Sequence, residues 1–527
     1  MSDSVFARAC ARAPEGMEIA AVAAAQSGRI ALWSGQGTVS FAELNAQANR
    51  LVRRLRAAGL AAGDAVALVC GNRAEFAVVR FATHRAGLRL TPINWHLAPE
   101  DIRYIVENCD ARALFLDTRV AAAAPGCAHI PALRLRVGIG GELPGYEPWC
   151  DALAGQDGAD IPDPSLGGTM LYTSGTTGRP KGVYRPPMDP AHAAALQQML
   201  TAVFRFDPES GHDRALATGP LYHTGPFSLC FTTPLTAGIG AVIMDKWEPE
   251  RMLALIEEHR ITHTFCVPTM FNRLLQLPEA TRARYDVSSL RFVIHGAAPC
   301  SVDVKKRMLD WWGPVLWEMF AGTEGQGTIV SPQEWLAKPG TVGRPAPGQL
   351  RILDDDGNEV PPGRSGTIYL VNPRGSAFEY FKDPAKTASV LREGYFTAGD
   401  IGHLDADGYL FLSGRSAEVI ISGGVNIYPQ EIDDVLARHR AVADVACVGV
   451  PNEDLGEEVK AVVELREGFT PDEALRQSLT DFCVEHLAKQ KWPRSIDFVE
   501  RLPRSEAGKV LRRAIRERYW AGRERQI

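Results

Sequence analysis

Hydrophobic positions near the start of the chain repeat with the period of a helix. Apolar residues recur at this spacing from Leu44 to Leu55. Ser40 and Glu43 precede them with the spacing of a capping box, in which each residue satisfies a backbone N–H of the first turn. Gly59 follows the last periodic position. The pattern therefore predicts an amphipathic helix that begins after Ser40 and ends before Gly59.

Short apolar runs alternate with helical patterns along the next stretch of the chain. Residues 65–70 and 113–117 are expected to form buried strands, and residues 73–87 and 99–108 are expected to form helices. This alternation predicts parallel sheets that are covered by helices. Residues 119–165 are rich in Ala, Gly and Pro, and we expect a surface excursion there.

The same alternation returns after residue 189. Helices are predicted at 189–204 and 249–259, and strands at 240–244, 262–268, 290–299 and 312–325. The last two strands run into polar, Gly-rich turns. Ligands gather at the carboxyl ends of strands in open parallel sheets, so these turns are candidate site loops.

The pattern changes at about residue 350. Asp-Gly turns between apolar runs predict antiparallel hairpins, which form a small β-barrel-like part. The last part of the chain has the pattern of a small α+β unit, with helices at 429–437 and 472–488 and strands at 444–450, 458–464 and 496–499. We expect the boundary near 413–418, which gives an N-terminal domain of residues 1–414 and a C-terminal domain of residues 415–527.

Composition and charge argue against nucleic-acid-binding, membrane-spanning and secreted proteins. The chain has 527 residues, which is too long for one core, with 45% hydrophobic and 23% charged residues and a formal net charge of -6. This balance argues against nucleic-acid binding, and no apolar run approaches the roughly 20 residues of a membrane helix. The start of the sequence has no long apolar segment of a signal peptide. The ten scattered cysteines, without a CxxC pair, indicate reduced thiols and a cytoplasmic location rather than a disulfide framework or a zinc site.

One short stretch, TSGTTGRPKG at residues 173–182, is rich in Ser, Thr and Gly and contains no large apolar residue. Its glycines allow backbone N–H groups to face an anion, its hydroxyls add donors, and Lys181 adds a positive charge. The residue after Lys181 is Gly182, so the stretch is not a Walker motif. A flexible linker is the alternative, but Pro180 stiffens the end and a predicted strand leads into the stretch. A phosphate-binding loop is therefore favoured.

This loop resembles the phosphate-binding signature of the adenylate-forming superfamily, which includes AMP-dependent acyl-CoA synthetases. Further stretches resemble the superfamily's motifs and follow them in order: HGAAP (295–299), FAGTEG (320–325), YFTAGD (395–400), GYLFLSGR (408–415), ISGGVNIYPQEID (421–433) and PRSEAGKVLRR (503–513). Together they cover roughly residues 40–515.

The resemblance implies an α/β fold with a large N-terminal domain of several subdomains and a small, mobile α+β C-terminal domain. It also implies a reaction in two halves. A carboxylate attacks the α-phosphate of ATP in the presence of Mg²⁺ and releases pyrophosphate, and the acyl-adenylate then passes its acyl group to a thiol, usually CoA. The implied partners are thus a small carboxylic acid, ATP and CoA, and a homodimer is one arrangement the sequence leaves open.

The resemblance also assigns roles to individual residues. The β- and γ-phosphates are expected on Thr173, Ser174, Gly175, Thr176, Thr177, Gly178 and Lys181. Thr323 is expected at the α-phosphate and Glu324 at Mg²⁺, an ion that prefers oxygen ligands. Gly296, Ala297 and Ala298 are expected to line the adenine, and Asp400 to accept hydrogen bonds from the ribose.

The catalytic residue that the resemblance implies for adenylation is Lys509, whose ammonium can bridge the attacking carboxylate and the α-phosphate. Arg415 is expected to bind ribose or phosphate beside the domain hinge. The superfamily's hinge residue, usually Asp or Lys, corresponds to Ala417 here, which is a departure. The C-terminal domain is expected to turn after adenylation, so that Lys509 leaves and the loop of Ser422, Gly423 and Gly424 enters to line the thiol channel.

Two further features are less specific. His223 corresponds to a residue that separates the acyl site from the pantetheine channel, and a gating role is expected, although a lone histidine is more often structural. The basic segment 512–525 is expected to be a solvated helix face, with a contact to the 3′-phosphate of CoA as the alternative.

The acid is expected to be apolar apart from its carboxyl group, of the fatty, aryl or steroid/bile-acid type. Small residues near the motifs leave room in the pocket, and no second cation is evident there. Two alternatives remain: an adenylating enzyme that delivers its acyl group to a carrier protein or another acceptor, and a non-catalytic nucleotide-binding relative. The second is disfavoured because Lys181, Glu324, Asp400 and Lys509 are all present.

Overall fold

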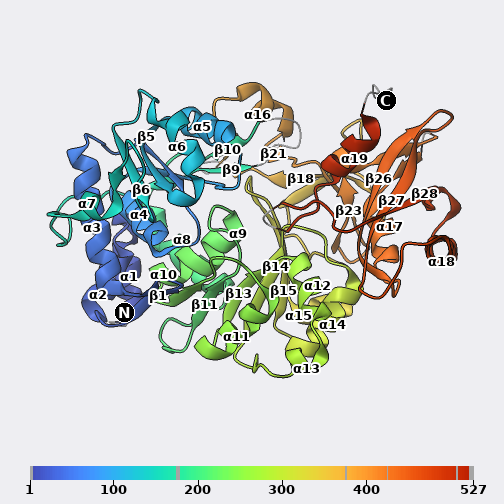
Figure 1. The fold of residues 1–527 in the computed structure, drawn as a ribbon, viewed down its shortest axis with the longest axis horizontal. Helices are drawn as coiled ribbons and strands as arrows, with labels where there is room; N and C mark the ends of the chain where they lie inside the picture. The colour runs from blue at the N-terminus through green and yellow to red at the C-terminus, as the bar shows by residue number, and fades with distance from the viewer. Residues whose placement is uncertain (1–3, 174–178, 374–376, 424, 506–507, 522–527) are drawn as a thin grey trace. The chain divides into compact units, whose positions relative to one another are not determined.

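The computed structural model describes residues 4–173, 179–373, 377–423, 425–505 and 508–521. The chain divides into two compact units, each built from stretches that are interleaved in the sequence (Figure 1). Unit 1 comprises Met1–Phe265, Glu279–Val293 and Pro373–Ser389, and unit 2 comprises Cys266–Pro278, Ile294–Asn372 and Val390–Ile527.

Unit 1 contains a six-stranded parallel sheet with the order β7-β6-β5-β3-β4-β8. The strands are β3 (Ala65–Val69), β4 (Arg89–Ile93), β5 (Ala111–Asp117), β6 (Leu135–Ile139), β7 (Glu147–Pro148) and β8 (Gly168–Thr169). The connecting helices include α3 (Phe41–Ala57), α4 (Ala74–Arg85), α5 (Pro99–Asn108), α6 (Ala124–Ala128) and α7 (Trp149–Leu153). The capping box of Ser40 and Glu43 is present at the start of α3, as predicted.

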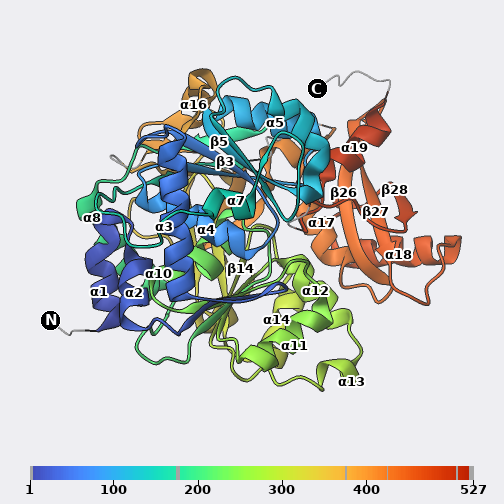
Figure 2. The same cartoon turned by 60° about the vertical axis from the view of Figure 1, so that its left-hand side comes forward.

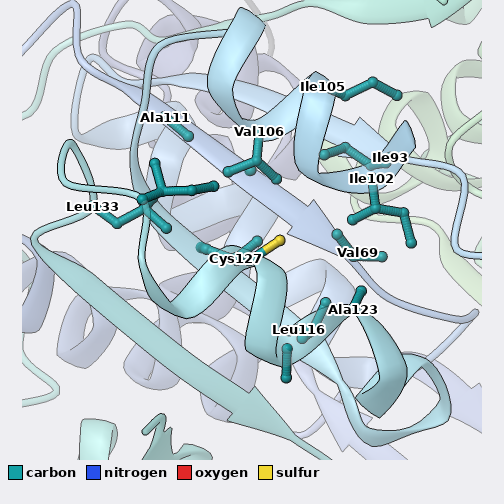
Figure 3. Packing of buried hydrophobic residues seen from close by; sticks show 14 of the residues in the cluster. Val69, Ile93, Ile102, Ile105, Val106, Ala111, Leu116, Ala123, Cys127 and Leu133 are labelled. Atoms are coloured by element: carbon teal, nitrogen blue, oxygen red, sulfur yellow. The ribbon is translucent and has the colours of Figure 1, made fainter. Parts of the chain in front are cut away.

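The core on one side of this sheet is closed by helices α5 and α6. Figure 3 shows Ile102 of α5 close to Val69 of β3, and Ile105, Val106 and Leu116 belong to the same buried cluster. All of these side chains are at most 1% exposed. Burial of apolar side chains on this scale contributes roughly 1.5–3 kcal/mol for each large residue, which fixes the sheet and its helices as one body.

The prediction of a surface excursion over residues 119–165 is wrong in part. The segment contains β6, whose Val137 and Ile139 are fully buried, and β6 pairs in parallel with β5. It also contains α6 and α7. The strand is short and its flanks are rich in Ala, Gly and Pro, so its stability comes from pairing with the preceding strand rather than from its own pattern.

The rest of unit 1 holds a second set of parallel strands. β11 (Arg214–Ala217) pairs in parallel with β12 (Gly240–Ile243) and β13 (His263–Cys266), and β12 pairs in parallel with β1 (Ile30–Ser34). β2 (Gly37–Ser40) adds an antiparallel edge. The helices of this part are α1 (Val5–Arg12), α2 (Glu18–Ala25), α8 (Pro190–Val203), α9 (Thr224–Phe227), α10 (Thr233–Thr236), α11 (Pro249–His259), α13 (Glu279–Arg282) and α16 (Pro384–Val390).

Unit 2 begins with helices and strands that continue the α/β pattern. They are α12 (Pro268–Gln276), β14 (Phe292–Gly296), α14 (Val302–Trp312), β15 (Leu316–Ala321), β16 (Gln326–Val330) and α15 (Pro332–Ala337). The predicted hairpins follow as a six-stranded antiparallel sheet of β17 (Leu350–Leu353), β18 (Gly366–Val371), β20 (Leu391–Arg392), β21 (Tyr395–Phe396), β22 (Asp400–Leu404) and β23 (Leu410–Arg415).

The last part of unit 2 is a five-stranded sheet with helices on both faces. Its strands are β24 (Ile420–Ser422), β25 (Val425–Ile427), β26 (Val442–Asn452), β27 (Gly456–Leu465) and β28 (Ser495–Val499). Val445 and Cys447 pack with α17 (Pro429–Leu436) and α18 (Glu473–His486), whereas the alternate residues Ala446 and Val448 pack with Ile515 of α19 (Arg512–Trp520). Figure 2 shows these helices around the strands. Alternate residues of a strand face opposite sides, so α19 lies on the face that α17 and α18 leave uncovered.

The predicted α/β class, with parallel sheets, helices and an α+β C-terminal part, is confirmed. Among the described helices, none has both the length and the hydropathy that crossing a membrane requires.

Candidate active site

Two of the predicted phosphate-loop residues, Thr173 and Lys181, lie on paired strands of unit 1. β9 (Leu171–Thr173) pairs antiparallel with β10 (Lys181–Tyr184), and Thr173 lies directly opposite Lys181. The ammonium of Lys181 lies 5.6 Å from the ring centre of Tyr380 on β19 (Glu379–Tyr380), which pairs with β10. Ser174, Gly175, Thr176, Thr177 and Gly178 lie outside the described residues. Their predicted role stays a prediction.

His223 precedes α9, also in unit 1. Its ring lies 4.7 Å from that of Tyr222, and burial lowers the pKa of His223 to about 4. The imidazole is therefore neutral at pH 7. A neutral ring suits contact with an apolar acyl group, which is compatible with the predicted gating role but does not test it.

The predicted adenine residues lie at the carboxyl end of β14 in unit 2. A Cβ atom on Gly296 would lie 2.5 Å from the backbone oxygen of Met319 on β15, so only glycine permits this approach of the two strands. The next residue, Ala297, has a φ of 67°, a left-handed conformation that costs a non-glycine residue roughly 1–2 kcal/mol. Strain of this kind is found mainly where a backbone must take one orientation for function.

A cavity of about 270 Å³ in unit 2 brings many predicted site residues together. Those that line it are Ala297, Ala298, Glu324, Asp400, Arg415 and Lys509. Thr323 precedes Glu324 and is half-buried. Ser422 ends β24, and Gly423 follows with a φ of 57° and a backbone N–H that donates to Leu455; neither lines this cavity. Gly424 lies outside the described residues.

Asp400 and Arg415 form an ion pair across a hairpin. They lie opposite each other on β22 and β23, and Nε of Arg415 donates to Oδ1 of Asp400 at 2.9 Å. Burial lowers the pKa of Arg415, but the carboxylates of Asp400, Glu418 and Glu324 outweigh it and leave the pKa raised. The site therefore contains a cation that stays charged at any working pH.

Lys509 lies on a tight hairpin that ends just before α19. Arg504 and Val510 form an antiparallel β-bridge. The N–H of Ser505 donates to the carbonyl of Lys509 at 2.8 Å, and the N–H of Gly508 donates to the carbonyl of Ser505 at 2.7 Å. Burial and the nearby Arg415 lower the pKa of Lys509, as does Arg512 more weakly, while Glu418 and Asp400 oppose the shift. An ammonium held partly out of water in this way acts strongly on a neighbouring anion.

Comparison with known proteins identifies the family. A model of the AMP-binding enzyme matches residues 19–380, and a model of the AMP-binding enzyme C-terminal domain matches residues 431–509. The chain belongs to the AMP-binding enzyme family. The predicted membership of the adenylate-forming superfamily, among AMP-dependent acyl-CoA ligases, is thereby confirmed.

This AMP-binding enzyme is similar to curated ligases along nearly its whole length. It is 33% identical over 503 residues to the indoleacetate–CoA ligase of Aromatoleum aromaticum, covering 93% of this chain and 95% of that protein. It is 31% identical over 500 residues to the fatty acid–[acyl-carrier-protein] ligase ScoC of Streptomyces coeruleorubidus, covering 93% of each. Among solved structures, the anthranilate CoA ligase AuaEII in complex with anthranoyl-AMP superposes with a TM-score of 0.84 at 25% identity, covering 96% of this chain and 97% of that one.

Arg512 was expected on a solvated helix face, and the structure corrects this expectation. Its side chain is 13% exposed and donates to the carbonyl of Cys447 at 2.9 Å and to Asp433. Its Nε also lies 3.2 Å from Oε2 of Glu418. Arg516 likewise pairs with the buried Glu457. These arginines attach α19 to the sheet and to the segment after β23, because buried cations require partners.

Glu418, which is adjacent to the unusual Ala417, is a site residue that sequence reasoning did not find. Its carboxylate pairs with Arg512 and acts electrostatically on both Arg415 and Lys509. The resemblance predicts the hinge at Ala417, and the structure has this carboxylate one residue later. The departure at Ala417 was a signal that could have pointed to Glu418.

The enzyme also buries an ion pair beside the turn of Gly296 and Ala297. Nζ of Lys305 lies 2.7 Å from Oε2 of Glu318, and Nε2 of His295 lies 3.6 Å from the same oxygen. His295 precedes Gly296, and Glu318 precedes Met319, so the pair lies where β14 and β15 approach most closely. Burial raises the pKa of Glu318 and lowers that of Lys305, and their mutual attraction opposes both shifts.

The cavity has more cationic groups than the sequence led us to expect. Besides Arg415 and Lys509, the guanidinium-bearing residues Arg307, Arg466, Arg504 and Arg512 also line it. Carboxylates line the cavity as well, and three of its arginines, Arg415, Arg504 and Arg512, are paired with Asp400, Asp444 and Asp433, so the lining carries charges of both signs.

Proposed function

We propose that this enzyme is an AMP-forming acid:CoA ligase. It activates an apolar carboxylic acid, of the fatty, aryl or steroid/bile-acid type, with MgATP to an acyl-adenylate and transfers the acyl group to CoA. The observation that carries the proposal is the single cavity that contains Lys509, the Asp400–Arg415 pair, Glu324 and the Ala297–Ala298 turn.

The first half-reaction joins two anions, and the cavity supplies the charge that this requires. The carboxylate oxygen attacks the α-phosphorus, the bond from that phosphorus to the bridging oxygen of the β-phosphate breaks, and pyrophosphate leaves. One positive charge about 4 Å away contributes about 4 kcal/mol at an effective dielectric constant near 20. Lys509 is the proposed source of this charge, and its partly buried position keeps the ammonium free of much competing water.

The nucleotide would be held by groups already oriented around the cavity. Asp400, fixed by its 2.9 Å bond to Arg415, has a second carboxylate oxygen for the ribose hydroxyls. Arg415 would contact ribose or phosphate, and the strained turn after Gly296 presents backbone to the adenine. Thr323 is proposed at the α-phosphate. In unit 1, the hairpin from Thr173 to Lys181 is proposed to bind the β- and γ-phosphates.

Glu324 is the proposed ligand of Mg²⁺. Its side chain lines the cavity, and its carboxylate is among the groups that raise the pKa of Arg415. The described residues include no cluster of three or more His, Cys, Asp or Glu that could hold a metal ion. Mg²⁺ commonly takes one or two carboxylates and completes its shell with phosphate oxygens and water. When bound, the ion would neutralise phosphate charge as pyrophosphate departs.

The acid class is supported by the small residues at the ends of β14 and β15. Ala297, Ala298, Ala321 and Gly322 line the cavity and leave room for an apolar body. Neutral His223 is proposed to separate this body from the thiol channel. The names of the relatives include indoleacetate, anthranilate and fatty-acid ligases, which fit aryl and fatty acids, and also 2-succinylbenzoate and sulfoacetate ligases, whose acids carry a second charge.

In the second half-reaction the sulfur of CoA attacks the acyl carbon, the bond to AMP breaks, and the thiol proton passes to solvent. We propose that residues 415–527 turn as one domain between the two halves, which removes Lys509 and brings in the loop of Ser422, Gly423 and Gly424. The similarity to ScoC supports one alternative acceptor, the thiol of an acyl carrier protein.

Pyrophosphate release measured with and without CoA, across a panel of fatty, aryl and steroid acids, tests the proposal. Release with at least one acid together with its CoA thioester is the expected result. Release without a thioester would favour the carrier protein, and no release with any acid would favour a non-catalytic protein. Lys509→Ala should lower adenylation by about 10²-fold and leave thioester formation from a supplied acyl-adenylate far less affected. The exposed Lys489→Ala is the matched control. Equal losses in both halves would contradict the role of Lys509.

A further inference from the structure

A hydrogen-bonded cluster joins the Lys509 hairpin to the start of α12. Oγ1 of Thr269 donates to the carbonyl of Gly508 at 2.8 Å. Nη1 of Arg504 donates to that same carbonyl at 2.9 Å and to Oγ1 of Thr269 at 3.1 Å. The carbonyl of Gly508, next to Lys509, therefore accepts hydrogen bonds from two donors that also contact each other.

Steric fit supports the same contact. Gly508 has a φ of 78°, which disfavours any side chain, and a Cβ atom built there would lie 3.4 Å from both Thr269 Cβ and Val267 Cγ2. The hairpin thus lies directly against the first turn of α12. Thr269, Arg504, Gly508 and Lys509 all line the cavity described above.

We propose that Thr269 and Arg504 form a clasp that holds the Lys509 hairpin in the position required for adenylation. This inference rests on the proposed function. Both residues act through the backbone of Gly508 and are positioning residues, because neither needs to touch the reacting atoms. The clasp fixes the peptide bond that leads into Lys509, and small displacements of a catalytic charge are costly.

The clasp crosses the proposed domain boundary, which gives it a second consequence. Thr269 belongs to residues 1–414, whereas Arg504 and Gly508 belong to residues 415–527. Arg504 also pairs with Asp444 on its own side of the boundary, so a turn of the C-terminal domain breaks only the bonds to Thr269. The hydroxyl of Thr269 therefore favours the adenylation arrangement over the thioester-forming one.

The cleanest test replaces only that hydroxyl. Thr269→Val keeps the shape of the side chain and should lower kcat for adenylation about tenfold, with the KM for ATP changed less than twofold. Thioester formation from a supplied acyl-adenylate should stay within twofold of the wild-type rate or increase. Thr269→Ser, which restores the hydroxyl, should recover most of the adenylation rate.

Thr83→Val is the matched control, because it removes the hydrogen bond from a fully buried hydroxyl to the Val79 carbonyl, 2.9 Å away in unit 1. It should leave the ratio of the two half-reaction rates unchanged. An unchanged adenylation rate in Thr269→Val, or equal losses in both half-reactions, would overturn the clasp.

Hydrogen–deuterium exchange separates failure of the clasp from failure of the proposed function. The N–H of Gly508 is bonded within the hairpin, and its peptide should exchange faster in Thr269→Val than in the wild-type protein or in Thr269→Ser. This measurement needs no substrate. If the wild-type protein released no pyrophosphate but the exchange difference were present, the proposed function would fail while the clasp would stand. Unchanged exchange would overturn the clasp.

Discussion

Removing Lys305 should destabilise the enzyme strongly, because its carboxylate partner would remain buried. Lys305 is fully buried and Glu318 is 7% exposed, with 2.7 Å between Nζ and Oε2. At an effective dielectric constant near 20, the gross attraction at that distance is about 6 kcal/mol. Much of it offsets desolvation, so the cost of Lys305→Met is set by the unpaired Glu318, about 3–5 kcal/mol.

The stability lost in Lys305→Met should increase as the pH rises. Burial already raises the pKa of Glu318 above its ordinary value of 4.5, and removal of Lys305 takes away the cation that opposes this shift. A carboxyl group with a raised folded-state pKa binds its proton more tightly in the folded protein. Stability is thus retained below the unfolded-state pKa and is lost as the pH rises through the folded-state value. The free energy of unfolding of Lys305→Met should therefore lie further below that of the wild-type protein at pH 8 than at pH 5.

Urea denaturation of both proteins at the two pH values measures the free energy of unfolding and tests this prediction. Lys306→Met, a change at the exposed neighbour on the same helix, should stay within about 0.5 kcal/mol of the wild-type protein. The double variant Lys305→Met/Glu318→Leu should recover most of the loss, since no charge is left unpaired. A single-variant cost below about 1 kcal/mol, or a double variant no more stable than the single one, would refute the reasoning.

Further predictions concern the charges around the cavity. The rate of adenylation should decline as the pH rises, because only the charged form of Lys509 acts. The midpoint of this decline should lie below the ordinary lysine pKa of 10.5, because burial lowers the pKa of Lys509. A pH profile of ATP–pyrophosphate exchange measures the midpoint. Glu418→Gln should move that decline to lower pH, since Glu418 raises the pKa of Lys509, and a shift to higher pH would contradict its role. Asp400→Asn weakens the bond to Arg415 and should raise the KM for ATP about tenfold; an unchanged KM would mean that Asp400 does not contact the nucleotide.

Local signals in the sequence were enough to predict many elements. The capping box at Ser40 depends only on residues three positions apart, and it is present at the start of α3. The hairpin of β22 and β23 follows from an Asp-Gly turn, and its register brings Asp400 opposite Arg415. The sequence suggested a role for each of these two residues but not their ion pair, because register depends on packing as well as on the turn.

Other features could not be predicted because their causes are distant in the sequence. β6 was missed because its stability depends on pairing with β5. Arg512 was placed on a solvated surface because nothing near it in the sequence indicates Asp433, 79 residues away. The contact between Thr269 and Gly508 spans 239 residues and has no local pattern at all. Motif resemblance indicated which residues belong together, and only the fold supplied the neighbours that hold them.

The interleaving of unit 2 along the chain has a consequence for biosynthesis. The residues that line its cavity run from Pro268 to Arg512, so the ribosome must deliver Arg512 before the cavity can close. Translation proceeds at roughly 5–20 residues per second, so the first residues of the cavity lining are synthesised on the order of tens of seconds before the last one. During that time the turn at Ala297 and the charged side chains of Lys305 and Glu318 must not form non-native contacts. Cells that make this enzyme should therefore show nascent chains of intermediate length associated with chaperones, released once the Lys509 hairpin has emerged.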